Sequence, residues 1–323
     1  MKVLFVPVTY NSYDALDNYI ASVGKALDAA ADPTIEVKIH VADNSTEVIR
    51  EYGGTGARGR EDRSEAGGNL VPPYPRTTAP SSIWTQELSH YPNPGYLPAA
   101  LQTVYAEDYA SYDYIVISNV DVTLDESFFT ALRDLKADAD TVWIAPFIWS
   151  PSEQRDVNPK IQERYTKKRL RLLRLLFACP PLYYLYTRTL YRSKIRRNGG
   201  TEAQGREDRS EAGGNLVPPY PRTPAPSNNL PRKNIYAGHG SFMIFRPDIF
   251  RQEPPLHYPV FLFCEEIYMA EMARRIGKTV AHCPAVKVWD REHASTGLMG
   301  LRRYCKYNHD ALSYIIRTFY EQD

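Results

Sequence analysis

Two groups of polar residues follow apolar runs in this chain, and both have the composition of chemical sites. Asn119 and Asp121 come after the Ile- and Val-rich run at 114–117, and Glu265 and Glu266 directly follow a second apolar run. A carboxylate beside an amide oxygen suits a hard divalent cation such as Mn²⁺ or Mg²⁺, which holds phosphates. A carboxylate that faces a hydroxyl group is what general-base catalysis requires.

Helix capping is the alternative explanation for both groups. Asn119 and Asp121 could cap a helix that begins near Asp125. The helix predicted from Glu265 onward has Glu271 on its polar face, and its dipole would favour an acid in the first turn. Capping explains two successive acids less well. Because the two acids are neighbours, their pKa values are expected to be raised.

An α/β sheet is the arrangement that would position these groups. We predict a buried strand at 2–8, a helix with one apolar face at 16–27, and an alternating strand at 35–41. Two strands joined by a helix form a right-handed parallel unit, whose loops meet at one edge of the sheet. Open α/β sheets bind ligands at the carboxyl ends of their strands. The run at 114–117 is then a further buried strand, with Asp121 at its carboxyl end.

Three residues are expected to converge at this edge, namely Thr9, Tyr10 and Asp43. Asp43 could accept a hydrogen bond from a ribose hydroxyl or a base N–H. No G-x-G-x-x-G follows the first strand and no G-x-x-x-x-G-K-[ST] occurs, so neither dinucleotide binding nor P-loop chemistry is supported. A metal ion at Asp121 would hold the phosphates of the nucleotide, for which the chain has no glycine-rich loop.

The overall composition is that of an ordinary globular protein. The 323 residues carry a formal net charge of +1, which implies no global field for nucleic acid or membranes. The four cysteines are widely spaced, so neither a zinc knuckle nor a disulfide framework is expected, and a reducing compartment is the simplest location. The start of the chain has the pattern of a strand and not of a signal peptide. No apolar run approaches the roughly 20 residues that span a bilayer.

One internal repeat stands apart from these elements. The sequence GREDRSEAGGNLVPPYPRT occupies 59–77 and recurs unchanged at 205–223. Both copies lack periodicity and are rich in Pro, Gly and charge, which is typical of segments that bury too little surface to order. We predict flexible surface insertions at 53–81 and 199–227, with a shared partner-binding or regulatory role as the alternative.

The segment 160–197 is strongly basic, with twelve Lys or Arg and one acid, Glu163. Apolar residues at helical spacing are interleaved with these charges, and tyrosines follow. They are Leu170, Leu173, Leu176, Phe177, Tyr183, Tyr184, Tyr186 and Tyr191. This pattern is typical of an amphipathic helix on an anionic membrane surface. The alternative is a solvated basic face over an ordinary core stripe; nucleic acid is not expected, because no recognisable reader motif is present.

Seven short motifs follow one another along the chain. They are VPVTYNS, VADNS, YPNPGYLPA, SNVDV, GHGSFMIFRPDIF, FCEEIYMAEMARRIG and WDREHAST. Their order and spacing resemble those of family 2 glycosyltransferases, and the nearest likeness is to rhamnosyltransferase-like members that build bacterial surface polysaccharides. The resemblance covers nearly all of the chain outside the two insertions and 160–197.

The resemblance implies a GT-A fold, with a mostly parallel central sheet flanked by helices. It also implies a single catalytic domain over 1–323, and we predict a C-terminal helix at 298–319. The implied reaction is an inverting transfer of a sugar from a nucleotide-sugar donor to a hydroxyl of a lipid-linked or growing surface glycan. Together with the basic segment, this predicts a cytoplasmic protein that is peripheral at the inner face of the cell membrane.

Carried over by position, the resemblance assigns roles to individual residues. Asp121 would match the last residue of the metal-binding D-x-D, whose first position here is Asn119. His293, in an H-x-S pattern, resembles a later ligand of metal or diphosphate; a surface histidine beside a helix is the alternative. Glu266 matches the second acid of the family's E-D motif and would be the base, with Glu265 left to orient the acceptor or cap the helix. The donor-binding residues would be Thr9, Tyr10, Asn11, Asp43, Asn93, Gly95, Tyr96 and Asn119.

Two other functions remain open. A nucleotidyltransferase would share the metal-bearing sheet edge, but a glycine-rich basic signature would be expected just after the first strand, and VPVTYNSY lacks it. A non-catalytic glycan- or nucleotide-binding protein would tolerate the loss of Asp121 and Glu266 without a change in its output.

Overall fold

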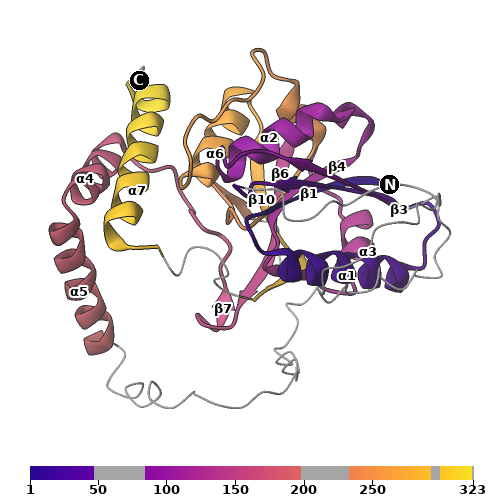
Figure 1. Cartoon of the computed structure of the whole chain (residues 1–323), viewed down its shortest axis with the longest axis horizontal. Helices are drawn as coiled ribbons and strands as arrows, with labels where there is room; N and C mark the ends of the chain where they lie inside the picture. Colours follow the sequence, from indigo (N-terminus) through magenta and orange to yellow (C-terminus); the bar gives the residue numbers. More distant parts are fainter. Residues whose placement is uncertain (47–83, 198–232, 292–298, 322–323) are drawn as a thin grey trace, which may run out of the picture. The chain divides into compact units, whose positions relative to one another are not determined.

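The computed structural model describes residues 1–46, 84–197, 233–291 and 299–321 (Figure 1). The chain divides into two compact units, where the sequence predicts one domain. The first unit contains Met1–Arg164 and Pro231–Leu298, and the second contains Tyr165–Leu230 and Met299–Asp323.

Three predictions fall on residues outside the described ranges. They concern the two insertions, at 53–81 and 199–227, and the ligand role of His293.

The first unit is built on one large sheet. Its strands run in the order β3-β2-β1-β4-β9-β6-β10-β5, with β7 paired to β6 and β8 paired to β10. The strands are β1 Lys2–Thr9, β2 Glu36–Asp43, β3 Trp84–His90, β4 Tyr114–Asn119, β5 Val122–Leu124, β6 Thr141–Ser150, β7 Arg155–Asp156, β8 Lys233–Ile235, β9 Phe242–Phe245 and β10 Thr279–Asp290. The three predicted strands, at 2–8, 35–41 and 114–117, are confirmed.

Strands β3, β2, β1 and β4 are parallel neighbours that end at one edge of the sheet. Their registers pair Asp43 with both Thr9 and His90, and Val8 with Asn119. Beyond β4 the sheet is mixed, because β9 is antiparallel to both β4 and β6. The predicted parallel arrangement therefore describes the half that carries Thr9 and Asp43, and the other half combines parallel and antiparallel pairs.

Helices cover both faces of this sheet (Figure 1). Helices α1 Tyr13–Ala30 and α3 Phe128–Arg133 lie on one face, and α2 Tyr96–Ala106 and α6 Glu265–Arg275 lie on the other. On the α1 side, the ring of Phe5 in β1 lies 6.4 Å from that of Tyr19 and 6.0 Å from that of Phe129. Buried aromatic side chains of this kind supply much of the stability, at about 25 cal/mol per Å² of apolar surface. Short 3₁₀ turns occupy Tyr109–Ser111 and Pro247–Arg251.

A strand, and not a helix, follows Asp121. Strand β5 starts at Val122 and pairs antiparallel with β10. Helix α3 begins after Ser127, whose amide N and Oγ donate to Asp125 Oδ1 at 3.0 Å and 2.6 Å. Helix capping therefore does not explain Asn119 or Asp121, because Asp125 fixes the start of α3.

The described residues of the second unit form three helices. They are α4 Lys167–Ala178, α5 Pro180–Arg197 and α7 Leu301–Ile315, the last of which continues as a π-helical turn over Ile316–Tyr320. Helix α7 lies within the range 298–319 in which a C-terminal helix is predicted. Helix α4 packs against α7, and the ring of Phe177 lies 4.7 Å from that of Tyr183 and 6.0 Å from that of Tyr304. In the ranges that the structure describes, no helix has the length and apolar character needed to cross a membrane.

Candidate functional site

The loops after β1 and β2 meet at the carboxyl edge of the sheet, as predicted, and are hydrogen-bonded to each other. The backbone N of Asn44 donates to the Thr9 carbonyl oxygen at 2.8 Å. The fully buried Asp43 carboxylate holds this junction, because it accepts hydrogen bonds from Tyr13 Oη at 2.8 Å and from Ser45 Oγ at 2.6 Å. Asp43 therefore organises the two loops, and the ribose contact assigned to it remains a prediction.

Several predicted donor-binding residues present polar groups beside this junction. Thr9 Oγ1 and Asn93 Oδ1 are both buried, and neither has a hydrogen-bond partner among the described residues. The Tyr10 side chain is exposed, and the left-handed Asn11, with φ 51°, donates its backbone N to Ser45 Oγ at 3.0 Å. A buried polar atom without a partner costs about 1–3 kcal/mol, so a ligand that supplied a donor to each oxygen would recover that free energy.

Gly95 allows the start of α2 to approach the segment before α6. Its φ is +114°, and a Cβ at this position would lie 2.2 Å from the Phe261 carbonyl oxygen, so a side chain is excluded there. The backbone N of Gly95 donates to Asn44 Oδ1 at 3.3 Å, and that of Tyr96 donates to the Phe261 oxygen at 3.3 Å. The start of α2 thus joins the loop after β2 to the approach to Glu265.

Tyr96 connects the two groups of acids that the sequence places far apart. Its Oη donates to the Gly240 carbonyl oxygen at 2.9 Å, and a Cβ at Gly240 would lie 3.6 Å from the carboxyl carbon of Glu266. Burial raises the pKa of Tyr96, and the nearby charges of Glu265, Asp121 and Glu266 raise it further. Asp121 and both glutamates therefore lie close enough for their charges to act on one part-buried phenol.

The two glutamates follow a turn with a rare backbone conformation. Phe263 and Cys264 both have positive φ, at 75° and 62°. Such conformations cost about 1–3 kcal/mol each and cluster at functional sites. Tyr258 Oη donates to the Phe263 oxygen at 2.5 Å, and the Phe263 backbone N donates to Glu265 Oε1 at 2.8 Å. These bonds hold the turn, and the turn determines where α6 presents Glu266.

The environments of Glu265 and Glu266 differ. Glu265 is 7% exposed, whereas Glu266 is partly exposed. Burial, and then the charge of Glu266, raises the pKa of Glu265 to about 8. The predicted upward shift is confirmed for Glu265, although burial is its larger cause. Glu265 therefore retains its proton at neutral pH, and Glu266 is the more accessible carboxyl group.

The turn after β4 is joined to two other elements. The backbone N of Asn119 donates to the Ser241 oxygen at 2.8 Å, and that of Arg291 donates to the Asp121 oxygen at 2.8 Å. The side-chain atom Asp121 Oδ1 is buried. A carboxylate and an amide are hard oxygen donors, so the two residues fit the predicted Mn²⁺ or Mg²⁺ by their chemistry.

His239, to which the sequence assigns no role, lies on the same turn as Gly240. Its Nδ1 accepts from the Ser241 backbone N at 3.2 Å and lies 2.8 Å from Ser241 Oγ, which places the ring proton on Nε2. Burial, together with the charges of Lys160 and Arg155, lowers the pKa of His239 to about 3. The side chain is therefore a neutral N–H donor beside two cations. The motif GHGS contains it, but the motif alone does not reveal the tautomer.

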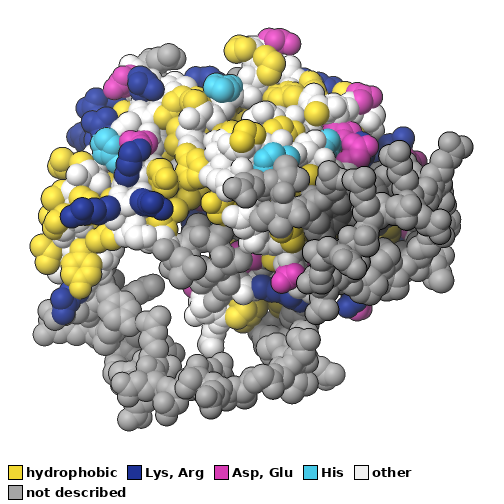
Figure 2. All heavy atoms as spheres, in the orientation of Figure 1, with side chains coloured by type: hydrophobic (Ala, Val, Ile, Leu, Met, Phe, Trp, Pro, Cys, Tyr) yellow, Lys and Arg dark blue, Asp and Glu magenta, His cyan; other side chains and the backbone are white. Residues whose placement is uncertain are grey.

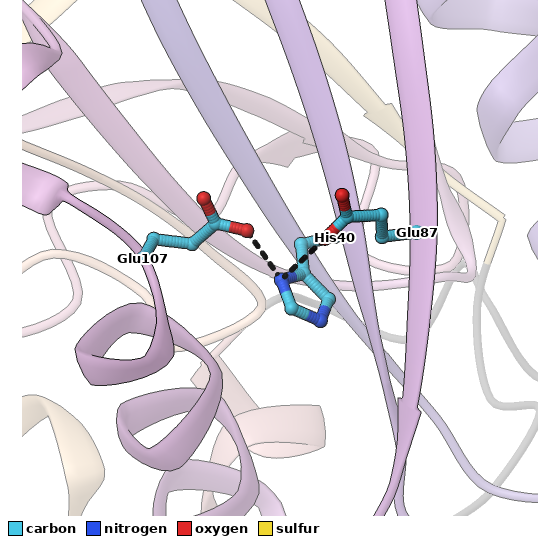
Figure 3. Close-up of side chains that lie close together, drawn as sticks. All are labelled: His40, Glu87 and Glu107. Carbon is cyan, nitrogen blue, oxygen red and sulfur yellow. Dashed lines mark hydrogen bonds and ion pairs between the residues drawn. The ribbon is translucent and has the colours of Figure 1, made fainter. Parts of the chain in front are cut away.

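A second charged cluster lies on β2, on β3 and after α2 (Figure 3). His40 Nδ1 lies 2.6 Å from Glu107 Oε1 and 3.8 Å from Glu87 Oε2. These three residues could hold a metal ion by type and spacing. However, Lys38 Nζ lies 2.8 Å from Glu107 Oε1 and 3.1 Å from Glu87 Oε2. Because Lys38 already supplies the positive charge, we interpret the cluster as an ion-pair network of the fold.

The buried Glu271 forms an ion pair with the partly exposed Arg164, and this pair corrects two expectations. Glu271, expected on the polar face of α6, is 2% exposed and accepts from Arg164 Nε at 2.7 Å and from Tyr236 Oη at 2.6 Å. A buried carboxylate needs such partners, and here they come from distant segments. Arg164 consequently belongs to the first unit and not to the basic surface predicted for 160–197.

Comparisons with known proteins return remote likenesses. No family model and no curated protein matches the chain. Among solved structures, the mannosyltransferase PcManGT from Pyrobaculum calidifontis, in complex with GDP-Man and Mn²⁺, is 10% identical over 91% of this chain and 58% of its own, with a TM-score of 0.44. The catalytic domain of Drosophila β1,4-galactosyltransferase 7, in complex with xylobiose, is 10% identical over 94% of this chain and 79% of its own (TM-score 0.39). GalNAc-T7 with UDP, GalNAc and Mn²⁺ is 9% identical over 100% of this chain and 49% of its own, with a TM-score of 0.45.

The chain spans 58% and 49% of the lengths of the mannosyltransferase and GalNAc-T7 chains.

Proposed function

We propose that this protein is a family 2-like, inverting glycosyltransferase that moves a hexosyl or rhamnosyl group from a nucleotide-sugar to a glycan hydroxyl. The observation that carries the proposal is the convergence at Tyr96. The Tyr96 hydroxyl donates a hydrogen bond to the carbonyl oxygen of Gly240, which lies beside Glu266. The charges of Asp121 and both glutamates raise the pKa of Tyr96. A base and an oxygen-rich cation site on one sheet edge are the groups that such a transfer needs.

Glu266 is the proposed general base, because it is more exposed than the buried Glu265. The acceptor oxygen attacks the anomeric carbon, and its proton passes to a carboxylate oxygen of Glu266. As the new C–O bond forms, the bond from that carbon to the diphosphate breaks, and the nucleoside diphosphate leaves with the electron pair. A single displacement of this kind inverts the anomeric configuration. Glu265 keeps its proton and can donate a hydrogen bond that orients the acceptor.

The donor would lie along the carboxyl edge formed by β1, β2 and β4. Thr9 Oγ1 and Asn93 Oδ1 are buried acceptors suited to groups of the base and ribose. Asn119 and Asp121 would hold Mn²⁺ or Mg²⁺, which when bound neutralises charge on the diphosphate. The neutral His239 Nε2–H, in the field of Lys160 and Arg155, suits the same anionic group.

The acceptor is proposed to be a lipid-linked or growing surface glycan, at the cytoplasmic face of a cell membrane. This part of the proposal is supported by the motif resemblance and by the basic composition of 160–197.

The experiment is a thermal-unfolding screen of the full chain with uridine, guanosine and thymidine diphosphate sugars, each with Mn²⁺. A donor at 100 times its Kd should stabilise the protein by about 2.7 kcal/mol. Release of a nucleoside diphosphate when glycan acceptors are added would support the transfer. Release of pyrophosphate from a nucleoside triphosphate and a sugar phosphate would instead indicate a nucleotidyltransferase. Stabilisation without any product across the acceptors would indicate a binding protein.

A further inference from the structure

The apolar stripe that the sequence predicts to face a membrane is packed inside the second unit. Leu170 is fully buried and Leu176 is 9% exposed, while Phe177 packs its ring against Tyr183. These residues form the core between helices, as the alternative interpretation of 160–197 proposes. Leu170 and Leu176 are therefore not available to a partner.

A different apolar face of α4 is open. Leu172 and Leu175 are 58% and 63% exposed. Together with Lys168 and Arg171 they occupy positions i, i+3, i+4 and i+7, which share one side of a helix. All four are exposed. The outer face of α4 thus places two leucines directly beside two cations.

Helix α5 also has an open apolar face. Leu182, Leu185 and Tyr186 are 43%, 59% and 40% exposed, and with Thr189 they again follow the spacing of a single helix face. Tyr183 points elsewhere, because its ring packs 5.7 Å from that of Tyr304. Figure 2 shows apolar side chains next to Lys and Arg over these helices, at the left of the view.

The charges on α4 and α5 themselves all have one sign. From Tyr165 to Arg197 the chain contains no Asp or Glu. Six cations fall between Tyr165 and Thr189, namely Lys167, Lys168, Arg169, Arg171, Arg174 and Arg188. A second copy of this face would repel the first, since a two-fold contact brings like charges together. A nucleic acid would satisfy the cations, but it would leave the leucines in water.

We propose that the outer faces of α4 and α5, defined by Lys168, Arg171, Leu172, Leu175, Leu182, Leu185 and Tyr186, dock on an anionic lipid surface. The leucines enter the boundary between headgroups and acyl chains, and the cations contact the lipid phosphates. Tyr186 has the amphipathic side chain that favours this boundary. The proposal does not depend on the transfer activity, because vesicle binding needs no donor or acceptor.

The test is flotation of the full-length protein with vesicles of phosphatidylcholine containing about a third phosphatidylglycerol. We expect the double variant Leu172→Gln/Leu175→Gln to bind at least tenfold more weakly than the wild type. Lys168→Gln/Arg171→Gln should weaken binding mainly at low salt, where charges are least screened. Lys25→Gln on the exposed side of α1 is the matched control and should bind like the wild type. Unchanged melting of each variant shows that the fold is intact.

Equal flotation of the leucine variant and the wild type would overturn the proposal. So would equal binding to vesicles of pure phosphatidylcholine, because the cations would then have no role. A dimer in solution that Leu172→Gln/Leu175→Gln dissociates would also overturn it, since the face would then be an interface between copies.

Discussion

The two acidic clusters of the first unit meet opposite electrostatic conditions. In the cluster of His40, Glu87 and Glu107, the Lys38 ammonium lies within 3.1 Å of both glutamates. At the Glu265–Glu266 pair, no lysine or arginine of the described ranges forms an ion pair with either acid. The first cluster is neutralised within the protein. The second has no neutralising side chain, so its negative charge is relieved by a proton or by a bound ligand.

The pKa shifts of the two clusters have opposite signs for this reason. Burial alone would raise the pKa of Glu107, but the hydrogen bonds and charges of Lys38 and His40 outweigh it and hold that pKa below its usual value. At Glu265 burial and a like charge act together, and the pKa is raised to about 8. Perturbed acids without a cation are typical of functional sites, whereas neutralised ones are typical of structural networks. The following variants test this distinction.

The largest effect is expected from Asp121→Asn. The charge on the nucleoside diphosphate grows as the glycosidic bond breaks, so a cation held by Asp121 stabilises the transition state more than the ground state. We expect transfer to fall by at least about a thousandfold, and Mn²⁺-dependent donor binding to be lost. Isothermal titration with donor and Mn²⁺ measures the binding. Asp125→Asn, which alters the start of α3, is the matched control and should keep both. Transfer that persists in excess chelator would show that Asp121 holds no metal.

Glu266→Gln should have the next largest effect. General-base catalysis contributes about 10² to 10⁴ in rate, so kcat should fall at least about a hundredfold while donor Kd changes little. Glu265→Gln should lower kcat less, because glutamine mimics the protonated acid. Steady-state kinetics and donor titration of both variants check this. The reverse ranking would assign the base to Glu265, and near-normal turnover in both would remove the pair from the chemistry.

The raised pKa of Glu265 predicts that stability falls as pH rises. The unfolded chain releases this proton near its ordinary value of 4.5, whereas the folded chain keeps it to about 8. Within that window the folded state binds more protons, so its free energy of unfolding decreases by up to about 1.4 kcal/mol per pH unit. Glu265→Gln should flatten the slope between pH 5 and 8, as measured by urea unfolding. An unchanged slope would mean that Glu265 is ionised in the folded protein.

Regular elements and the residues at their ends could be predicted from the sequence. Apolar periodicity marks β1, β2 and β4, and parallel geometry then brings Thr9 and Asp43 together. The pairing of Arg164 with Glu271, 107 positions apart, could not be predicted, because no local pattern records a partner so distant. Strand β3 has the polar sequence WTQELSH and lacks the apolar signal of its neighbours. The positive φ of Phe263 and Cys264 is imposed by tertiary contacts, since neither residue favours it.

Glu107→Gln should affect stability and not catalysis. Its side chain is 8% exposed, and the substitution removes the negative charge that Lys38 and His40 share. We expect the free energy of unfolding at pH 7 to fall by about 1–3 kcal/mol with kcat unchanged. Because the pKa of Glu107 is lowered, its contribution exists above pH 4.5 and is lost as pH falls below that value. Urea unfolding at pH 7 and at pH 3 should therefore show a smaller difference between variant and wild type in acid. A large loss of kcat would place this cluster in the chemistry.

The smallest effect is expected at His239, and it distinguishes this histidine from His40. His40 shares Glu107 through Nδ1 and bonds Ser89 Oγ through Nε2 at 2.8 Å, so both of its nitrogens are used by the fold. His239 uses Nδ1 for Ser241 and holds its proton on Nε2, beside Lys160 and Arg155.

We expect His239→Gln, whose amide can still donate, to lower kcat/KM about threefold. His239→Ala should lower it about tenfold, or about 1.4 kcal/mol, the size of one hydrogen bond. Because the pKa of His239 is about 3, the kcat/KM profile of the wild type between pH 5 and 8 should contain no inflection that His239→Ala removes. Such an inflection, or equal loss in both variants, would show that His239 acts as a titrating group or through packing, and not as a fixed neutral donor.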